Sequence, residues 1–267
     1  MEHIQERRLY MVKSGNSTIV RSAARALDVL EIVVQAEKAP TFTMIQKASG
    51  IPKSSLSYLM QELVQKHYVQ YDPELKVYYP GLALLALSAE CMSTTNFSVE
   101  LTRGIKSLQE ETGETTHAVI REGRFAIFIG KQASAKAVSS VLNIGFKLGA
   151  HATGCGLVML ASLPDDELHA LIDPVTLEQY TPYTITDKKR LYREIRRVRR
   201  YGYAFDDQGN ILGGCCIAAP VYNREKEVVA AISISVLASK ATISYLRFLR
   251  RKVREKAQEI SMRLGYL

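Results

Sequence analysis

The chain has 267 residues, 47% hydrophobic and 23% charged, a balance that excludes a disordered protein and fits two modest domains. No apolar run approaches the roughly 20 residues that a membrane helix needs, and the start, MEHIQERRLY, is too charged for a signal peptide. The four cysteines show no Cys-x-x-Cys spacing, which argues against a disulfide framework and a zinc site. We therefore expect a cytoplasmic protein with reduced thiols, without a membrane partner, a bound metal or a cofactor.

The formal net charge of +8 is compatible with nucleic-acid binding but does not locate it. Residues 1–80 carry ten Lys and Arg against eight Asp and Glu, whereas the excess lies in two later segments, 188–200 and 247–256. The first of these is amphipathic through Leu191, Ile195 and Val198, so we interpret its arginines as a solvated helix face.

Three short helices are predicted near the N-terminus. Residues 20–35 form the first, with an expected buried stripe of Ala23, Ala26, Leu27, Leu30, Val33 and Val34. A second covers 42–49 and ends at Gly50, and Pro52 suits the first position of a third. The third helix would bury Leu56, Leu59, Met60, Leu63 and Val64. Its other side would then carry Ser54, Ser57, Tyr58 and Gln61.

A β-hairpin is predicted next, because HYVQYD and KVYYPG flank the turn-forming residues 72–75. Three helices, an abrupt break before the last and a hairpin are the plan of a winged helix-turn-helix, whose last helix enters the DNA major groove. The candidates for DNA contact are Lys53, Ser54, Ser55, Ser57 and Tyr58, with Arg21, Arg25 and Lys76 for phosphates. A helical packing module with a polar surface is the alternative.

The rest of the chain predicts a different kind of domain. Helices are expected over 82–93 as a linker, and over 97–113, 164–172, 187–202 and 243–264. Residues 149–163 are expected to be a Gly-rich loop leading into a further helix. Strands are expected over 115–121, 124–132, 137–145, 214–222 and 227–237. Antiparallel strands with intervening helices indicate an α+β domain that is separate from the N-terminal one.

Three stretches resemble the IclR family of bacterial transcriptional regulators. The first is STIVRSAARALDVLEIV together with ASGIPKSSLSYLMQELVQKHYVQYD and VYYPG, and the second is LGAHATGCG. The third is GYAFDDQGNILGGCCIAAPVYNREKEVVAAISIS. The resemblance covers nearly the whole chain, from about Ser17 to Leu267.

The resemblance implies an α+β protein in which a winged helix-turn-helix is joined by a linker helix to a GAF-like effector-binding domain with an antiparallel sheet. On this chain the divisions would be 1–80 for DNA binding, 81–96 for the linker helix and 97–267 for effector binding and oligomerisation. Members of the family generally act as dimers or tetramers that bind operator DNA and respond to small metabolites, often carboxylates or aromatic acids.

The same resemblance implies which residues bind the effector: Gly154, Cys155, Asp206, Cys216, Ser233 and Ser235. A loop entering a helix offers free backbone N–H groups to an anion, and serine hydroxyls add neutral donors. Each residue also has a plainer interpretation. The serines would suit a solvated strand face, Asp206 would suit a turn, and the two cysteines would suit a packed core.

Three positions depart from the family pattern. Tyr58 and Leu157 stand where relatives often have Arg and Lys, and Cys215 replaces an Arg that we place at the pocket edge. Tyr58 removes a charged DNA contact, so the operator sequence does not follow from the resemblance. Leu157 would alter the size of the effector or the way the loop closes, and Cys215 favours an effector that is less charged or more apolar.

We therefore expect a ligand-responsive transcriptional regulator without catalytic activity, whose partners are double-stranded operator DNA, a small-molecule effector and further copies of itself as a homodimer or homotetramer. A constitutive repressor whose C-terminal domain only oligomerises is the first alternative. A thiol hydrolase using Cys216 or Cys155, with His151 as base and Asp206 orienting it, is the second.

Overall fold

The computed structural model describes residues 20–94, 96–134 and 142–267. The chain divides into two compact units, Met1–Cys91 and Met92–Leu267. The strand expected over 137–145 lies mostly outside the described residues.

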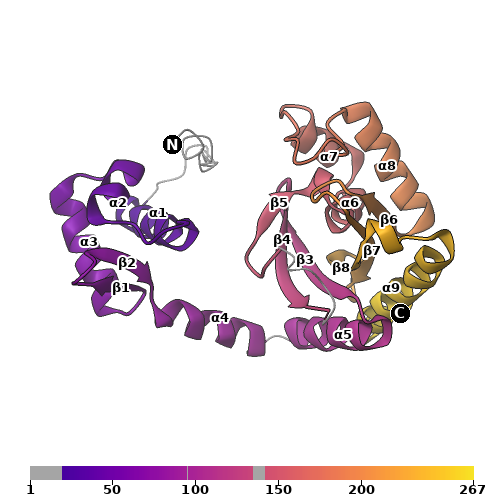
Figure 1. Ribbon diagram of the computed structural model, residues 1–267, viewed down its shortest axis with the longest axis horizontal. Helices are drawn as coiled ribbons and strands as arrows, with labels where there is room; N and C mark the ends of the chain where they lie inside the picture. The colour runs from indigo at the N-terminus through magenta and orange to yellow at the C-terminus, as the bar shows by residue number, and fades with distance from the viewer. Residues whose placement is uncertain (1–19, 95, 135–141) are drawn as a thin grey trace. The chain divides into compact units, whose positions relative to one another are not determined.

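The first unit is a winged helix-turn-helix (Figure 1). It contains α1 (Arg21–Gln35), α2 (Phe42–Ser49), α3 (Lys53–Gln65), β1 (Val69–Asp72) and β2 (Val77–Pro80). Gly50 ends α2 with a φ of 66°, the left-handed conformation that glycine adopts without a Cβ clash. The break between α2 and α3 therefore lies where the sequence predicted it.

The core of this unit confirms the expected buried face of α3 and corrects that of α1. Leu56, Met60 and Leu63 of α3 are buried. On α1 the buried residues are Val29 and Val33, whereas Leu27 and Val34 are 62% and 52% exposed, so their expected burial was wrong. Residues 29–34 are apolar except for Glu31, which permits two neighbouring stripes, and the position of Ile45 and α3 in the same core selects one of them.

The helix expected as a linker is α4 (Leu82–Thr94). Leu82, Leu85 and Leu87 of this helix are exposed. Within the described parts of the chain, no helix is both long enough and apolar enough to cross a bilayer.

The second unit is built on a six-stranded antiparallel sheet with the order β5-β4-β3-β8-β7-β6. The strands are β3 (Thr115–Glu122), β4 (Phe125–Gln132), β5 (Lys147–Gly149), β6 (Ala204–Asp207), β7 (Gly214–Tyr222) and β8 (Val228–Leu237). The central pair, β3 and β8, joins residues that are far apart in sequence, as in Thr115 opposite Ser235 and His117 opposite Ser233. Residues distant in sequence therefore meet at the middle of the sheet.

Helices cover both faces of this sheet (Figure 1). One face packs against α5 (Asn96–Thr112) and α9 (Ile243–Arg263), through Ile105, Leu249 and Val253 among others. The other face packs against α6 (Gly154–Ala161), with α7 (Asp165–Ile172) and α8 (Lys188–Tyr201) in the same core. The buried residues of α8 are Leu191, Ile195 and Val198, which confirms its predicted amphipathic character.

Candidate functional site

The exposed face of α3 carries the residues predicted to contact DNA. Lys53 begins the helix, and Ser54, Ser55, Ser57 and Tyr58 are all exposed, Tyr58 by 73%. The buried residues of α3 lie on its other side, so these five side chains form one polar surface at the N-terminal end of the helix.

The starts of α1 and α3 suit an anion. Arg21 is the first residue of α1 and Lys53 the first of α3, and neither helix has an acidic residue in its first turn. A cation at a helix N-terminus is repelled by the helix dipole, and a phosphate bound there satisfies both the cation and the free N–H groups. Arg25, one turn further along α1, is half-buried.

The wing places Lys76 at the end of a tight turn. The Asp72 carboxylate accepts hydrogen bonds from the backbone N–H groups of Glu74 and Leu75, each at 2.9 Å. Lys76 follows with a φ of 55° and is exposed. The turn thus holds a cation at the tip of the hairpin.

The six residues predicted to bind the effector, here called the effector cluster, come from three neighbouring strands and the start of α6. Asp206 of β6 pairs with Cys216 of β7, which pairs with Ser235 of β8. The Ser233 hydroxyl hydrogen-bonds the thiols of Cys155 and Cys216. All six lie on the face of the sheet that α6 covers.

Gly154 lies where the start of α6 meets the strands. A Cβ atom at this position would lie 2.9 Å from the Cys216 sulfur and 3.6 Å from Asp206, so only glycine fits without a shift. The Gly154 backbone N–H is hydrogen-bonded to the Cys216 sulfur. Thr153 supplies no side-chain cap, which leaves the remaining first N–H groups of α6 available for a ligand.

Asp206 is a buried acid with an altered pKa. Burial is the main cause that raises the pKa of its carboxyl to about 7; the Gly209 N–H, at 2.9 Å from Asp206 Oδ1, opposes this rise and the charge of Asp207 adds to it. The same hydrogen bond stabilises the turn that follows β6, so Asp206 also has the structural role of a turn residue. Near neutral pH this carboxyl is partly protonated and donates as well as accepts.

His117 lies beside the cluster and was not among the predicted site residues. Its Nδ1 is 3.4 Å from the Ser235 hydroxyl, and its Nε2 is the one buried side-chain polar atom among the described residues without a hydrogen-bond partner. Burial, and then the charge of Lys131, lower the pKa of His117 to about 4, so the ring is neutral at physiological pH. Lys131 is the residue opposite His117 on β4.

The sequence offered one signal for His117. It is an ionisable residue in a strand that is otherwise suited to burial, but only the pairing of β3 with β8 reveals that it adjoins Ser233 and Ser235.

The thiols lack the features of a nucleophile. Burial raises the pKa of Cys155 to about 12 and raises that of Cys216 well above its usual range. His151, the expected base, has its Nε2 2.9 Å from the Glu178 carbonyl oxygen. A catalytic cysteine needs a lowered pKa and an adjacent base, so this geometry argues against the thiol hydrolase.

Two departures from the family pattern, Cys215 and Leu157, are buried in the core. Cys215 points to the opposite face of the sheet from Cys216 and packs in the core beneath α9. Our placement of Cys215 at the pocket edge was therefore wrong. The preference for a less charged effector that we drew from Cys215 has no support in this structure. Leu157 is buried in the core under α6.

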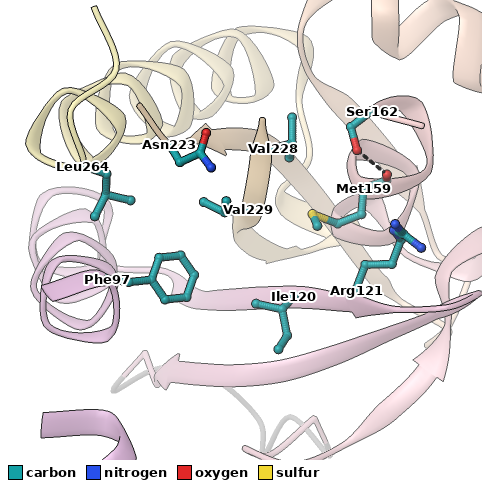
Figure 2. Close-up of a pocket in the computed structure, with 9 residues that line it drawn as sticks. All are labelled: Phe97, Ile120, Arg121, Met159, Ser162, Asn223, Val228, Val229 and Leu264. Carbon is teal, nitrogen blue, oxygen red and sulfur yellow. Dashed lines mark hydrogen bonds between the residues drawn. The ribbon is translucent and has the colours of Figure 1, made fainter. Parts of the chain in front are cut away.

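A separate cleft of about 590 Å³ opens at one end of the same unit, and none of the six cluster residues lines it (Figure 2). It lies where β3 and β8 diverge.

Comparisons with known proteins agree with this architecture. The family described as "Bacterial transcriptional regulator IclR C-terminal" matches residues 90–262, and the "IclR helix-turn-helix domain" matches residues 22–73. The HTH-type transcriptional regulator XynR of Escherichia coli is 31% identical over 248 residues, 93% of this chain and 98% of its own.

Solved structures give the same result. The crystal structure of Thermotoga maritima IclR superposes with a TM-score of 0.73 at 28% identity, covering 93% of this chain and all of its own. An IclR homologue from Microbacterium hydrocarbonoxydans, crystallised with 4-hydroxybenzoate, shares the fold with a TM-score of 0.79 at 22% identity, covering 91% of this chain and 98% of its own. With a DNA-binding unit and a second unit that both match, this chain belongs to the IclR family of transcriptional regulators.

Proposed function

We propose that this DNA-binding regulator is controlled by a small carboxylic acid, aliphatic or aromatic, that binds at the effector cluster. The observation that carries the proposal is the gathering of polar groups on a buried face. Asp206, Ser233 and His117 are all less than one-tenth exposed, and all lie on the face of the sheet that α6 covers. Asp206 and Ser233 already make hydrogen bonds, whereas the buried Nε2 of His117 has no partner among the described residues. Burying an unpaired polar group is unfavourable, so a ligand that pairs with this nitrogen would account for its presence.

The chemistry favours an anion with few charges. The first N–H groups of α6, the two serine hydroxyls and a protonated Asp206 are all donors, and Lys131 adds a positive charge from the neighbouring strand. The 4-hydroxybenzoate bound by the Microbacterium hydrocarbonoxydans homologue has one carboxylate on an apolar ring, which makes it a reasonable probe.

At the DNA, the exposed face of α3 would enter the major groove. Ser54, Ser55, Ser57 and Tyr58 would contact base edges, while the cations Lys53, Arg21, Arg25 and Lys76 would contact phosphates. Two copies would supply two half-sites, because one recognition helix rarely gives enough affinity for a bacterial operator. Effector binding would change operator affinity by about 5- to 150-fold, the usual range for such coupling.

The test is a thermal-shift screen of the purified chain against small carboxylates and aromatic acids, followed by operator binding with each acid that raises the melting temperature. A ligand that binds only the folded state stabilises it by about 2.7 kcal/mol at a hundredfold excess over its Kd. The variant Ser235→Ala with Cys216→Ser should abolish the shift. Ser239→Ala with Cys215→Ser is the matched control, since Ser239 is exposed and Cys215 faces the other side of the sheet.

Two results would count against the proposal. An acid that binds without changing operator affinity would remove effector control, and a panel with no binding acid would favour the constitutive repressor with an oligomerisation domain.

A further inference from the structure

The two central strands of the sheet pair along only part of their length. The β3–β8 ladder runs from Thr115 opposite Ser235 to Val119 opposite Ala231. Beyond it, Ile120–Glu122 stay with β4, and Val228–Ala230 stay with β7. The sheet is therefore split at this end, and the cleft of about 590 Å³ lies in the split (Figure 2).

The cleft is lined from both faces of the sheet. The lining residues are Phe97, Ile120, Arg121, Met159, Ser162, Asn223, Val228, Val229 and Leu264. On one face of the sheet, Phe97 lies in the first turn of α5 and Leu264 directly follows α9. On the other face, Met159 and Ser162 lie at the end of α6. Most of these side chains are apolar, and Phe97, Val229 and Leu264 remain partly exposed. An apolar ligand would cover surface that the chain leaves in contact with water.

One cation lies among these apolar residues. The Arg121 guanidinium donates to the Gly123 carbonyl at 3.0 Å, and its other terminal nitrogen is 3.5 Å from the carboxylate of Glu167. The Glu167 side chain is 55% exposed, so this ion pair is weak and open to exchange. A guanidinium has five N–H donors, which leaves some for a carboxylate.

The other polar residues add little charge. The Ser162 hydroxyl donates to the Met159 carbonyl at 2.8 Å and its oxygen can still accept (Figure 2). Both ends of the Asn223 side chain are taken up by Glu227. The cleft thus offers apolar walls and one positive charge, and its volume lies within the range of about 300–1,000 Å³ typical of small-molecule sites.

We propose that this cleft binds an apolar monocarboxylic acid, with its carboxylate on Arg121 and its hydrocarbon part against Phe97, Val229 and Leu264. The site is separate from the effector cluster. It is connected to that cluster through α6, since Gly154 and Cys155 begin the helix and Met159 and Ser162 lie at its other end, about 10 Å away at 1.5 Å per residue. Our proposal includes that a ligand at either site changes the affinity of the other, a regulatory role that rests on the proposed function.

The experiment is calorimetric titration of the full chain with sodium octanoate, kept below its micelle concentration, and with 1-octanol as the uncharged probe. Arg121→Gln should weaken octanoate binding at least tenfold and leave octanol binding unchanged, while Arg121→Lys should restore part of the loss. Val229→Phe should block both probes by filling the cleft. Arg193→Gln, which changes an exposed arginine on α8 outside both sites, is the matched control.

The effector-cluster variant Ser235→Ala with Cys216→Ser separates this proposal from the proposed function. Octanoate binding that survives in this variant and is lost in Arg121→Gln supports the cleft. Octanoate binding that is lost in the cluster variant would place the acid at the cluster, which supports the proposed function and overturns the cleft. Octanoate binding that does not change in Arg121→Gln would also overturn the cleft, and it would not count against the proposed function. If octanoate binds the cleft but leaves the affinity of the cluster for its own acid unchanged, the regulatory role is wrong.

Discussion

At the scale of single residues, the effector cluster combines a buried acid, a buried neutral imidazole and two thiols kept protonated by burial. Their protonation states make them hydrogen-bond donors and acceptors without full charge, which suits recognition of a small anion in an apolar surrounding.

Asp206 should make stability depend on pH in a defined direction. Its pKa is about 7 in the folded chain and 3.8 in an unfolded chain. Between these pH values the folded chain therefore binds more protons than the unfolded chain, and the free energy of unfolding falls as the pH rises. Asp206→Asn should remove this loss, so the variant should gain about 2 to 3 kcal/mol relative to the native chain between pH 5 and pH 8. Urea unfolding at both pH values measures it, and parallel pH profiles would contradict it.

The same titration should appear in effector binding. Above pH 7 the ionised Asp206 repels a carboxylate, so affinity should fall by up to about tenfold per pH unit in the native chain but not in Asp206→Asn.

His117 should show opposite effects on stability and on binding. The buried, unpartnered Nε2 costs about 1–3 kcal/mol, so His117→Leu should keep or raise the melting temperature while the thermal shift with the effector disappears. His169→Leu is the control, because His169 pairs with Asp173 at the surface. A His117→Leu chain that binds the acid normally would exclude this residue from the site.

At the scale of secondary structure elements, the start of α6 is fixed by its close contact with β7. Gly154→Ala would place a methyl group 2.9 Å from the Cys216 sulfur, and we expect a loss of about 1–3 kcal/mol in unfolding free energy. Adding Cys216→Ala should recover part of it. A double-mutant cycle by urea unfolding measures the coupling, and strictly additive effects would show that the helix start moves freely.

The wing and α3 should each contribute phosphate contacts. Lys53→Gln and Lys76→Gln should each lower the slope of log K against log salt by about 0.9, with little change in operator sequence preference. Lys189→Gln, an exposed position on the basic helix α8, should leave the slope unchanged. Equal effects of all three would place the basic helix on the DNA as well.

Most elements could be predicted because their signals are local. Gly50, the alternating runs beside Asn223 and the stripe on α8 all lie within one helix or hairpin. The burial of Val29 in place of Leu27 could not be predicted, because contacts with α2 and α3 decide which side of α1 is buried. The neighbours of His117 could not either, since they depend on which strands meet at the centre of the sheet.

At the scale of the whole molecule, most of the positive net charge lies outside the DNA-binding unit. Residues 92–267 hold 25 of the 35 Lys and Arg, and part of that surplus is held in ion pairs, such as Arg199 with Asp165 and Lys252 with Glu111. The DNA-binding unit is close to neutral and would rely on a few cations at helix starts and at the wing tip.

Assembly should be visible in the operator. If two copies bind two half-sites, then in an operator selected from random DNA by the full chain, inserting about 5 base pairs between the half-sites should weaken binding strongly. Inserting about 10 should restore much of it, because the half-sites return to the same side of the duplex. Light scattering gives the number of copies, and a single half-site bound as tightly as the pair would contradict the assembly.

The central position of β8 also affects how the chain is made. As the ribosome adds residues in order, the β3–β4 hairpin and the edge strand β6 with β7 emerge first, and the strand that joins them comes only near the end. A chain stopped before Val228 would carry the DNA-binding unit, two half-sheets with open edges and an effector cluster without its serines. Translation that stops late in the message would thus yield fragments that lack the proposed sensor. Their unpaired strand edges would make these fragments prone to aggregation.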